Sequence, residues 1–154
     1  MLRTIFSLAT VALLALPLSG CSRGFSITTP AGFAELDGQK DYGYRATSPQ
    51  GVVIAVRREK NEPYGDLSFW SGAVDAQLRR GGYKAIKAID VAASGVKGKQ
   101  IHYVVVRSGR EHMFWVSVFV TEKAVVTVEV GGDLEYFEKA EKALSAAIAS
   151  VQID

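Results

Sequence analysis

Three consecutive runs of β-branched and aromatic residues restrict the folds open to this chain more than any other feature. They lie at positions 101–107, 110–120 and 124–130. Residues of these types favour β-strands. The first two runs are separated only by Ser108 and Gly109, a loop that suits a tight antiparallel hairpin and would place His102 opposite Trp115. The sequence therefore predicts an antiparallel meander.

Two other segments show the spacing of a helix. The first, 66–80, has Asp66 available as its N-cap and Gly81 as its stop. The second, 134–151, follows Asp133, which would cap it in the same way. The apolar positions are Leu67, Trp70, Val74 and Leu78 in the first segment, and Phe137, Ala140, Leu144, Ala147, Ile148 and Val151 in the second. Each segment is predicted to be an amphipathic helix that buries one face.

The remaining strand signals are shorter. Extended pieces are predicted at 25–28, 33–36, 44–48, 52–57 and 83–92. The turn at 48–51 has proline second and glycine fourth, so the strands on either side should form a hairpin. The run 57–62 mixes charges of both signs and predicts a solvated loop. No repeat or linker divides the chain, so we expect one α+β domain over 25–154, with an antiparallel sheet of about six to seven strands and two main helices.

The first residues predict an export signal. Arg3 supplies a positive charge, an apolar run follows at 5–16, and Pro17 ends it. This run has the length of a signal-peptide core, and it is shorter than the roughly 20 apolar residues that a membrane-spanning helix needs. We therefore expect residues 1–20 to be a cleaved signal peptide.

Residues 18–21 (Leu-Ser-Gly-Cys) resemble the lipobox of bacterial lipoproteins. The resemblance implies cleavage between Gly20 and Cys21 and lipidation of the Cys21 sulfur, so that two or three acyl chains hold the protein at a membrane. Residues 21–24 would then be a short lipidated tether. Ser22 implies sorting to the periplasmic face of the outer membrane. The alternative is an ordinary secreted protein that is cut elsewhere and carries a chance cysteine.

The order of the predicted elements and one short motif resemble a known fold family. A strand led by an aromatic residue precedes a turn of the form Pro-x-Gly-aromatic, made by Pro30, Gly32 and Phe33. A hairpin, a helix, a long meander and a C-terminal helix follow, as in the Mog1/PsbP-like fold of DcrB-type lipoproteins. The resemblance covers nearly all of the chain after the predicted signal peptide. It implies a protein that binds other proteins or assists larger assemblies.

The two histidines do not predict a shared site. In the hairpin register, His102 and His112 point to opposite faces of the sheet, so they cannot join one metal site or one acid–base pair. The glycine-rich stretch 93–100 lacks the first glycine and the Ser/Thr of a phosphate-binding loop, and it precedes a strand. The net charge of +2 is scattered among acidic residues. We expect no cofactor, no metal site and no nucleic-acid partner.

The run 113–120 is apolar on both faces. It is either a central strand, covered by helices on one side and by the N-terminal hairpin on the other, or half of an exposed groove. In the second case Tyr103, Phe114 or Trp115 would form an interaction surface.

Three functions follow from these observations. The leading hypothesis is a lipid-anchored accessory or protein-interaction module of the cell envelope, which is not an enzyme and has an envelope protein as its partner. The alternative is a carrier of a small apolar ligand in a cleft between the sheet and the helices. A hydrolase would need His102 or His112 within hydrogen-bonding reach of a serine and an acid.

Overall fold

The structure is a computed structural model that describes residues 23–38 and 40–154. The predicted signal peptide, its cleavage site at Gly20 and Cys21, and therefore the lipidation site lie outside the described residues. The described strands are β1 (Phe25–Ser26), β2 (Ala34–Glu35), β3 (Tyr44–Thr47), β4 (Val53–Lys60), β5 (Lys84–Ala93), β6 (Val96–Arg107), β7 (Arg110–Val120), β8 (Ala124–Asp133) and β9 (Gln152–Ile153). The helices are α1 (Leu67–Arg80) and α2 (Leu134–Ala149).

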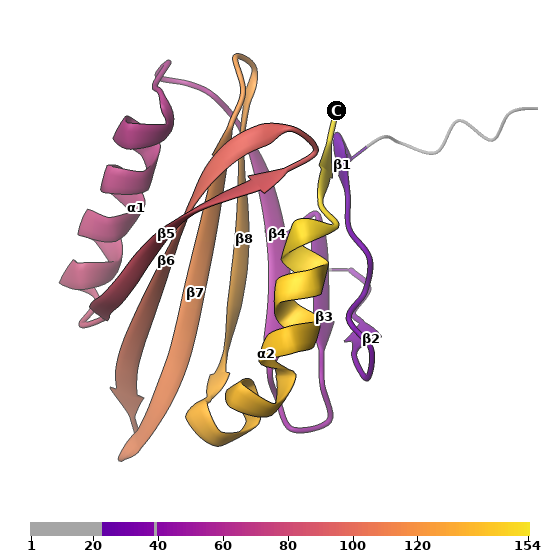
Figure 1. Cartoon of the computed structure of the whole chain (residues 1–154), viewed down its shortest axis with the longest axis vertical. Coiled ribbons are helices and arrows are strands. Elements are labelled where there is room, and N and C mark those ends of the chain that lie inside the picture. Colours follow the sequence, from indigo (N-terminus) through magenta and orange to yellow (C-terminus); the bar gives the residue numbers. More distant parts are fainter. Residues whose placement is uncertain (1–22, 39) are drawn as a thin grey trace, which may run out of the picture.

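One antiparallel sheet holds seven of these strands, in the order β2-β3-β4-β8-β7-β6-β5. Strands β1 and β9 form a separate antiparallel pair, with Phe25 opposite Ile153. The meander β6-β7-β8 has the predicted register, with His102 opposite Trp115. Figure 1 shows the twisted sheet with one helix on either side. The predicted single α+β domain is confirmed, and β9 is a strand that the sequence analysis did not predict.

Both predicted helices form, and both have the predicted N-caps. The side chain of Asp66 accepts a hydrogen bond from the backbone N–H of Phe69 at 2.8 Å, and the side chain of Asp133 accepts one from that of Glu135 at 3.3 Å. Among the described residues, neither helix is long and apolar enough to cross a membrane.

Helix α2 ends at Ala149, before the predicted end at residue 151. The hydroxyl of Ser150 donates a hydrogen bond to the carbonyl oxygen of Ala147 at 2.7 Å, which satisfies a carbonyl group at the end of the helix. The same hydroxyl oxygen accepts a bond from the backbone N–H of Thr28 at 3.0 Å. The chain then continues into β9, whose pairing with β1 requires an extended backbone.

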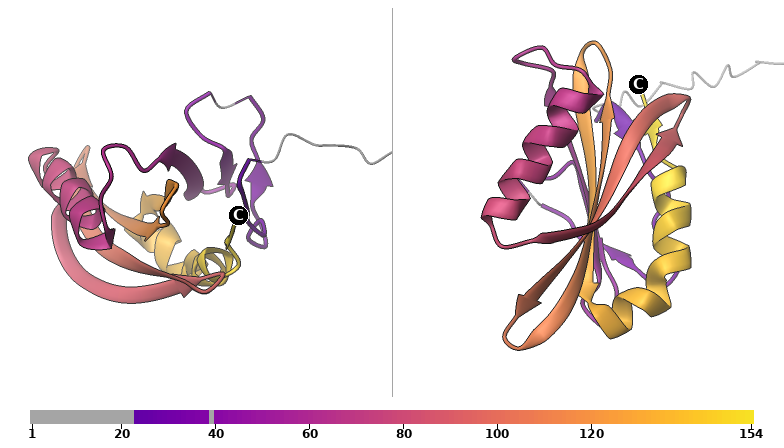
Figure 2. Two further views of the ribbon diagram at one scale, coloured as in Figure 1. Left: turned by 90° about the horizontal axis from the view of Figure 1, so that it is seen from above. Right: turned by 60° about the vertical axis from the view of Figure 1, so that its left-hand side comes forward.

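The two helices cover opposite faces of the sheet (Figure 2). Successive residues of a strand point to opposite faces, and in β7 Trp115 packs in the cluster that contains Phe137 of α2, whereas Val116 packs in the cluster that contains Val74 of α1. The expectation of a doubly covered central strand is confirmed, but its cover differs from the predicted one. Hairpin β3-β4 pairs with β8 and extends the sheet instead of lying across its face, because β4 pairs with β8 along its whole length.

The glycine-rich stretch 93–100 is a hairpin and the start of β6. Ser94 and Gly95 both have positive φ, at 53° and 76°, as a two-residue turn between twisted strands requires. Gly98 lies opposite Phe119, and a Cβ atom there would come within 2.5 Å of the Phe119 ring. Glycine therefore lets the ring lie across β6, which begins at Val96 rather than near residue 101.

The prediction of a solvated loop at 57–62 is wrong. Strand β4 continues to Lys60, which pairs with Ala124 of β8, and Asn61 beyond it is only 5% exposed. The last side chains of β4 are exposed, but β8 binds their backbone groups. The pattern of charges indicates that these side chains are exposed, but it does not show that their backbone groups pair with a neighbouring strand.

Candidate functional site

Of the three aromatic residues predicted as an interaction surface, Tyr103 and Phe114 lie opposite each other in β6 and β7, and Trp115 points to the other face of the sheet. Tyr103 is fully buried against α1, and Trp115 is 5% exposed on the opposite face of the sheet against α2. Of the three, Phe114 reaches a cavity, where its ring packs on Tyr83 with centroids 5.2 Å apart. The predicted surface is therefore wrong for Tyr103 and Trp115, because the helices of the domain itself cover both.

His102 belongs to a buried polar network on the α2 face of the sheet. Its Nε2 lies 2.9 Å from Oε1 of Gln100, whose Nε2 donates to the hydroxyl oxygen of Ser117 at 2.8 Å. The imidazole ring stacks on Trp115 with centroids 4.0 Å apart. Burial, with a smaller effect from Lys87, lowers the pKa of His102 to about 4, so the ring is neutral at pH 7. The partner of His102 is an amide, and the network positions Trp115 in the core.

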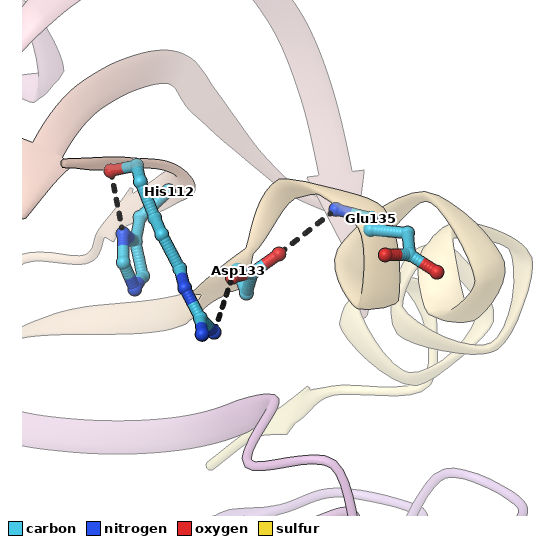
Figure 3. Close-up of polar contacts among 4 residues, drawn as sticks. His112, Asp133 and Glu135 are labelled. Atoms are coloured by element: carbon cyan, nitrogen blue, oxygen red, sulfur yellow. Dashed lines mark hydrogen bonds and ion pairs between the residues drawn. The ribbon is translucent and has the colours of Figure 1, made fainter.

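His112 lies on the other face, as the predicted register requires, near the start of β7 (Figure 3). Its Nδ1 lies 3.2 Å from the carbonyl oxygen of Arg110, and Nη1 of Arg110 lies 3.5 Å from Oδ2 of Asp133. The other oxygen of Asp133 caps α2. In the described part of the chain, His102 therefore contacts a side-chain amide and His112 a backbone carbonyl, and neither makes the contact with an acid that the hydrolase hypothesis needs.

A cleft of about 420 Å³ opens between α1 and the part of the sheet beside it. Helix α1 packs on β5, β6 and β7, so its inner edge leaves β4 and β8 facing the cleft. The lining residues are Tyr42, Arg57, Glu59, Val74, Gln77, Leu78, Tyr83, Phe114, Val116, Thr127 and Glu129. This cleft is the candidate functional site.

The floor of the cleft carries an ion pair between neighbouring strands. Arg57 of β4 and Glu129 of β8 lie with Nε and Oε1 3.4 Å apart. They meet because Ala55 is directly opposite Glu129, which places Arg57 diagonally across on the same face. Nη2 of Arg57 also donates to the hydroxyl of Tyr42 at 2.6 Å, and its Cζ lies 4.3 Å from the centroid of the Tyr42 ring.

The ion pair is partly shielded from water. The side chain of Glu129 is 23% exposed and that of Arg57 is 36% exposed. Burial raises the pKa of the Glu129 carboxyl, although the neighbouring Arg57 acts in the opposite direction. Polar groups fixed in this way, beside the rings of Tyr83 and Phe114, are suited to recognise a ligand that offers both polar groups and apolar surface.

The sequence analysis missed Tyr42, Arg57 and Glu129. One signal was available, because Glu129 is the single charged residue in the run 124–130, which otherwise consists of alanine, valine and one threonine. A charge inside a buried strand needs a partner. Nothing local identifies that partner, because Arg57 is 72 positions away in the sequence.

A second, shallower cavity of about 370 Å³ lies where the Pro-x-Gly-aromatic motif meets α2. The motif forms a turn in which the backbone N–H of Phe33 donates to the carbonyl oxygen of Pro30 at 3.1 Å. Phe33 packs against the core on the α2 face. Apart from Phe33, the cavity is lined by Ala31, Gly32, Ser48, Gln50, Tyr136, Lys139, Ala140 and Ala143. The motif therefore packs the N-terminal segment against α2.

The layers described above define a PsbP-like α+β fold, as comparison with solved structures shows. LpqN of Mycobacterium tuberculosis, described as involved in cell envelope biogenesis, is similar with a TM-score of 0.71 and 10% identity, over 84% of this chain and 82% of LpqN. Cyanobacterial PsbP (CyanoP) from Synechocystis sp. PCC 6803 is similar with a TM-score of 0.61 and 10% identity, over 96% of this chain and 99% of CyanoP. The Pseudomonas aeruginosa protein PA94 has a TM-score of 0.51 and 16% identity, over 87% of this chain and 85% of PA94.

No protein-family model matches the sequence, and no curated protein matches it. At identities this low, the likeness to solved structures shows the fold alone. The Mog1/PsbP-like fold expected from the order of the elements is confirmed.

Proposed function

We propose that this chain is a lipid-anchored protein of the bacterial cell envelope whose domain acts as a non-enzymatic accessory module and recognises a protein partner in the cleft beside α1. The observation that carries the proposal is the half-buried pair of Arg57 and Glu129, braced by Tyr42 on the cleft floor. Arginine and tyrosine held in partly desolvated pockets are typical anchors of protein interfaces. The likeness to LpqN, which is described as involved in cell envelope biogenesis, supports an envelope role.

The anchor part of the proposal depends on Cys21. Lipid on its sulfur, with further acylation of the new amino group, would hold the protein at the membrane almost irreversibly. A Cys21→Ser variant should leave the membrane fraction, and the intact mass of the wild-type mature protein should include the acyl chains. Retention of the variant with the membranes, or an unmodified mature N-terminus, would contradict the anchor. Separation of inner and outer membranes tests the outer-membrane location that Ser22 implies.

The cleft part is tested by site-specific crosslinking in intact cells. A photoactivatable residue at Gln77, exposed on the α1 wall of the cleft, should form a reproducible adduct with one protein. The same residue at Lys142, exposed on α2, is the matched control. Arg57→Met keeps an unbranched side chain of similar shape near the backbone but loses the guanidinium, so it should abolish the adduct at Gln77. Equal adducts at both positions, or an adduct unchanged by Arg57→Met, would count against the cleft as the interface.

A small ligand is the second candidate for the cleft, because its volume of about 420 Å³ lies within the range of small-molecule sites. The ion pair on the floor favours a ligand with a polar head over the purely apolar ligand expected from the sequence. Native mass spectrometry of protein purified without denaturation should then show an added mass that Arg57→Met removes. A mass equal to that of the lipidated chain alone would eliminate this candidate.

A further inference from the structure

Strand β1, where the described chain begins, lies at the same end of the domain as several turns that are distant from it in sequence. The hydroxyl of Ser94, in the β5-β6 turn, donates to Oε1 of Gln152 in β9 at 3.1 Å. The backbone N–H of Asn61 donates to the carbonyl oxygen of Lys123, in the β7-β8 turn, at 3.1 Å. Figures 1 and 2 show these turns, β1, the C-terminus and the first turn of α1 at one end of the long axis. The β6-β7 turn lies at the opposite end.

Two aromatic side chains are exposed at the end where the chain enters. Tyr64, in the segment between β4 and α1, is 76% exposed, and Phe69, in the first turn of α1, is 51% exposed. The Phe69 ring lies so close to Gly65 that a Cβ atom at that position would overlap it. Removing side chains of this size from water is favourable, so the two rings offer apolar surface for a contact at this end of the domain.

Asn61 holds the segment that carries Tyr64. This buried side chain accepts hydrogen bonds from the N–H of Gly65 at 2.9 Å and from Nε1 of Trp70 at 2.7 Å. It also donates to the carbonyl oxygens of Gly65 and Thr121, both at 3.0 Å. Its donors and acceptors are all used. The segment is therefore pre-organised, and a contact made through it would cost little additional conformational entropy.

We propose that this end of the domain rests on the bilayer surface in which the lipidated Cys21 is anchored, with Tyr64 and Phe69 in the headgroup region. The inference rests on the proposed lipid anchor. Even a fully extended chain between Cys21 and Phe25 spans at most about 14 Å, so the end that carries β1 stays near the membrane. Tyrosine is favoured at the membrane–water interface, because its ring can be buried there while its hydroxyl remains hydrated. Phenylalanine is among the apolar residues that interfacial segments bury at the boundary between headgroups and acyl chains.

Charge contributes little to this contact. The exposed charged side chains closest in sequence to the two rings and to the β7-β8 turn are Lys60 and Lys123, which are positive, and Glu62, Asp66 and Glu122, which are negative. Because these charges include no basic excess, the contact depends on the aromatic rings and needs no anionic lipid.

The same orientation holds the cleft away from the bilayer. Its α1 wall is made by Val74, Gln77 and Leu78, in the second half of a helix whose first turn would face the membrane. At about 1.5 Å per residue, these residues lie about 7 to 14 Å further along the helix axis than Phe69. The anchor would therefore leave the cleft open to a partner.

The test uses the lipidated mature protein reconstituted into phosphatidylcholine vesicles. The Cys21 sulfur is blocked by lipid, so a single new cysteine can carry a fluorescent label. Lys123→Cys places the label at the proposed contact and leaves both aromatic rings in place, and Glu111→Cys places it at the opposite end; both positions are exposed. Nitroxide-bearing lipids should quench the label at residue 123 several-fold more than the label at residue 111.

A second set of variants tests the role of the rings. Adding Tyr64→Ser and Phe69→Ser to Lys123→Cys should strongly reduce the quenching, while the protein still floats with the vesicles. Adding phosphatidylglycerol should leave the quenching unchanged. Equal quenching at residues 123 and 111, quenching that survives loss of both rings, or quenching that appears only with phosphatidylglycerol would overturn the proposed contact. Failure of the wild-type protein to float with vesicles would instead overturn the anchor, and the contact with it.

Discussion

The side-chain oxygen of Asn61 accepts a hydrogen bond from the indole nitrogen of Trp70 at 2.7 Å. Asn61 follows the last residue of β4, and Trp70 lies in the first turns of α1. The amide nitrogen of Asn61 also reaches the carbonyl oxygen of Thr121, at the end of β7. One buried amide thus fixes where α1 begins relative to the sheet, and the position of α1 in turn defines one wall of the cleft.

Asn61→Ala should destabilise the domain by about 2–4 kcal/mol, because it removes several hydrogen bonds and leaves buried partner groups unsatisfied. Urea denaturation measures the change in the free energy of unfolding. Asn61→Asp would place a buried carboxylate oxygen against the carbonyl oxygens of Gly65 and Thr121, so its loss at pH 7 should be at least as large. Gln77→Ala, on the exposed surface of α1, is the near-neutral control. A loss for Asn61→Ala no larger than that of the control would show that the network is not stabilising.

Tyr103→Phe should weaken the docking of α1 on the sheet. The hydroxyl of Tyr103 donates to Oδ1 of Asp75 at 3.0 Å, and Asp75 also binds Arg79 at 2.8 Å. Burial, together with Asp75, raises the pKa of Tyr103 well above its ordinary value, so the hydroxyl keeps its proton. We expect a loss of about 1–2 kcal/mol in urea denaturation. Tyr136→Phe, at a more exposed tyrosine, should change stability little, and an equal effect of both variants would contradict the prediction.

His102 should make stability depend on pH. Its pKa is about 4 in the folded protein and near 6.5 when unfolded, so the unfolded chain binds the proton more readily. The contribution of the neutral ring is complete above about pH 6.5 and is lost as the pH falls toward 4; its size is at most about 3 kcal/mol. His102→Gln should remove this part of the decline in stability, measured by urea denaturation at several pH values. His112→Gln should retain it.

Gly98→Ala and Gly72→Ala should have opposite effects. An added Cβ at Gly98 would meet the ring of Phe119, and we expect a loss of about 1–3 kcal/mol. Gly72 lies within α1 with nothing within 4 Å of an added Cβ, so alanine there should stabilise the helix by about 0.5–1 kcal/mol. Thermal unfolding distinguishes the two changes. Destabilisation of similar size in both variants would show that the close approach of Phe119 is not the cause.

Arg57→Met should create a pH-dependent loss of stability in the cleft. Burial already raises the pKa of the Glu129 carboxyl, and Arg57 opposes this rise. Without the guanidinium, the carboxylate loses its counter-charge, so its pKa should rise further. The folded protein then favours the protonated acid, and stability relative to wild type should fall as the pH rises above about 4.3, the ordinary pKa of glutamate. Adding Glu129→Gln should abolish this pH dependence. Urea denaturation from pH 4 to pH 7 measures this. The same pH dependence of stability in Arg57→Met and in the double variant would contradict the prediction.

The elements that the sequence predicted correctly have local causes. The N-caps Asp66 and Asp133 and the hairpin loop at Ser108 and Gly109 depend on residues within a few positions of one another. The register that pairs His102 with Trp115 follows from that loop, because side chains alternate along a strand. The order of the elements then sufficed to identify the fold.

The candidate site could not be predicted in this way. The charged run 57–62 has the composition of a loop, yet its first residues pair with β8, and Asn61 is buried and hydrogen-bonded to Thr121 and to Trp70. The surface predicted for Tyr103 and Trp115 failed for the same reason: sequence pattern shows that both faces of β7 are apolar, but it does not show which helix covers each face.

The sequence alone determined both helices, their N-caps, most of the strands and the register of the meander, because these depend on interactions between near neighbours in the chain. The tertiary structure alone decided that β4 lies beside β8, that the helices occupy opposite faces, and that Arg57 meets Glu129 from 72 positions away. Those arrangements depend on packing and on the pairing of backbone groups distant in sequence, for which this chain carries no local signal.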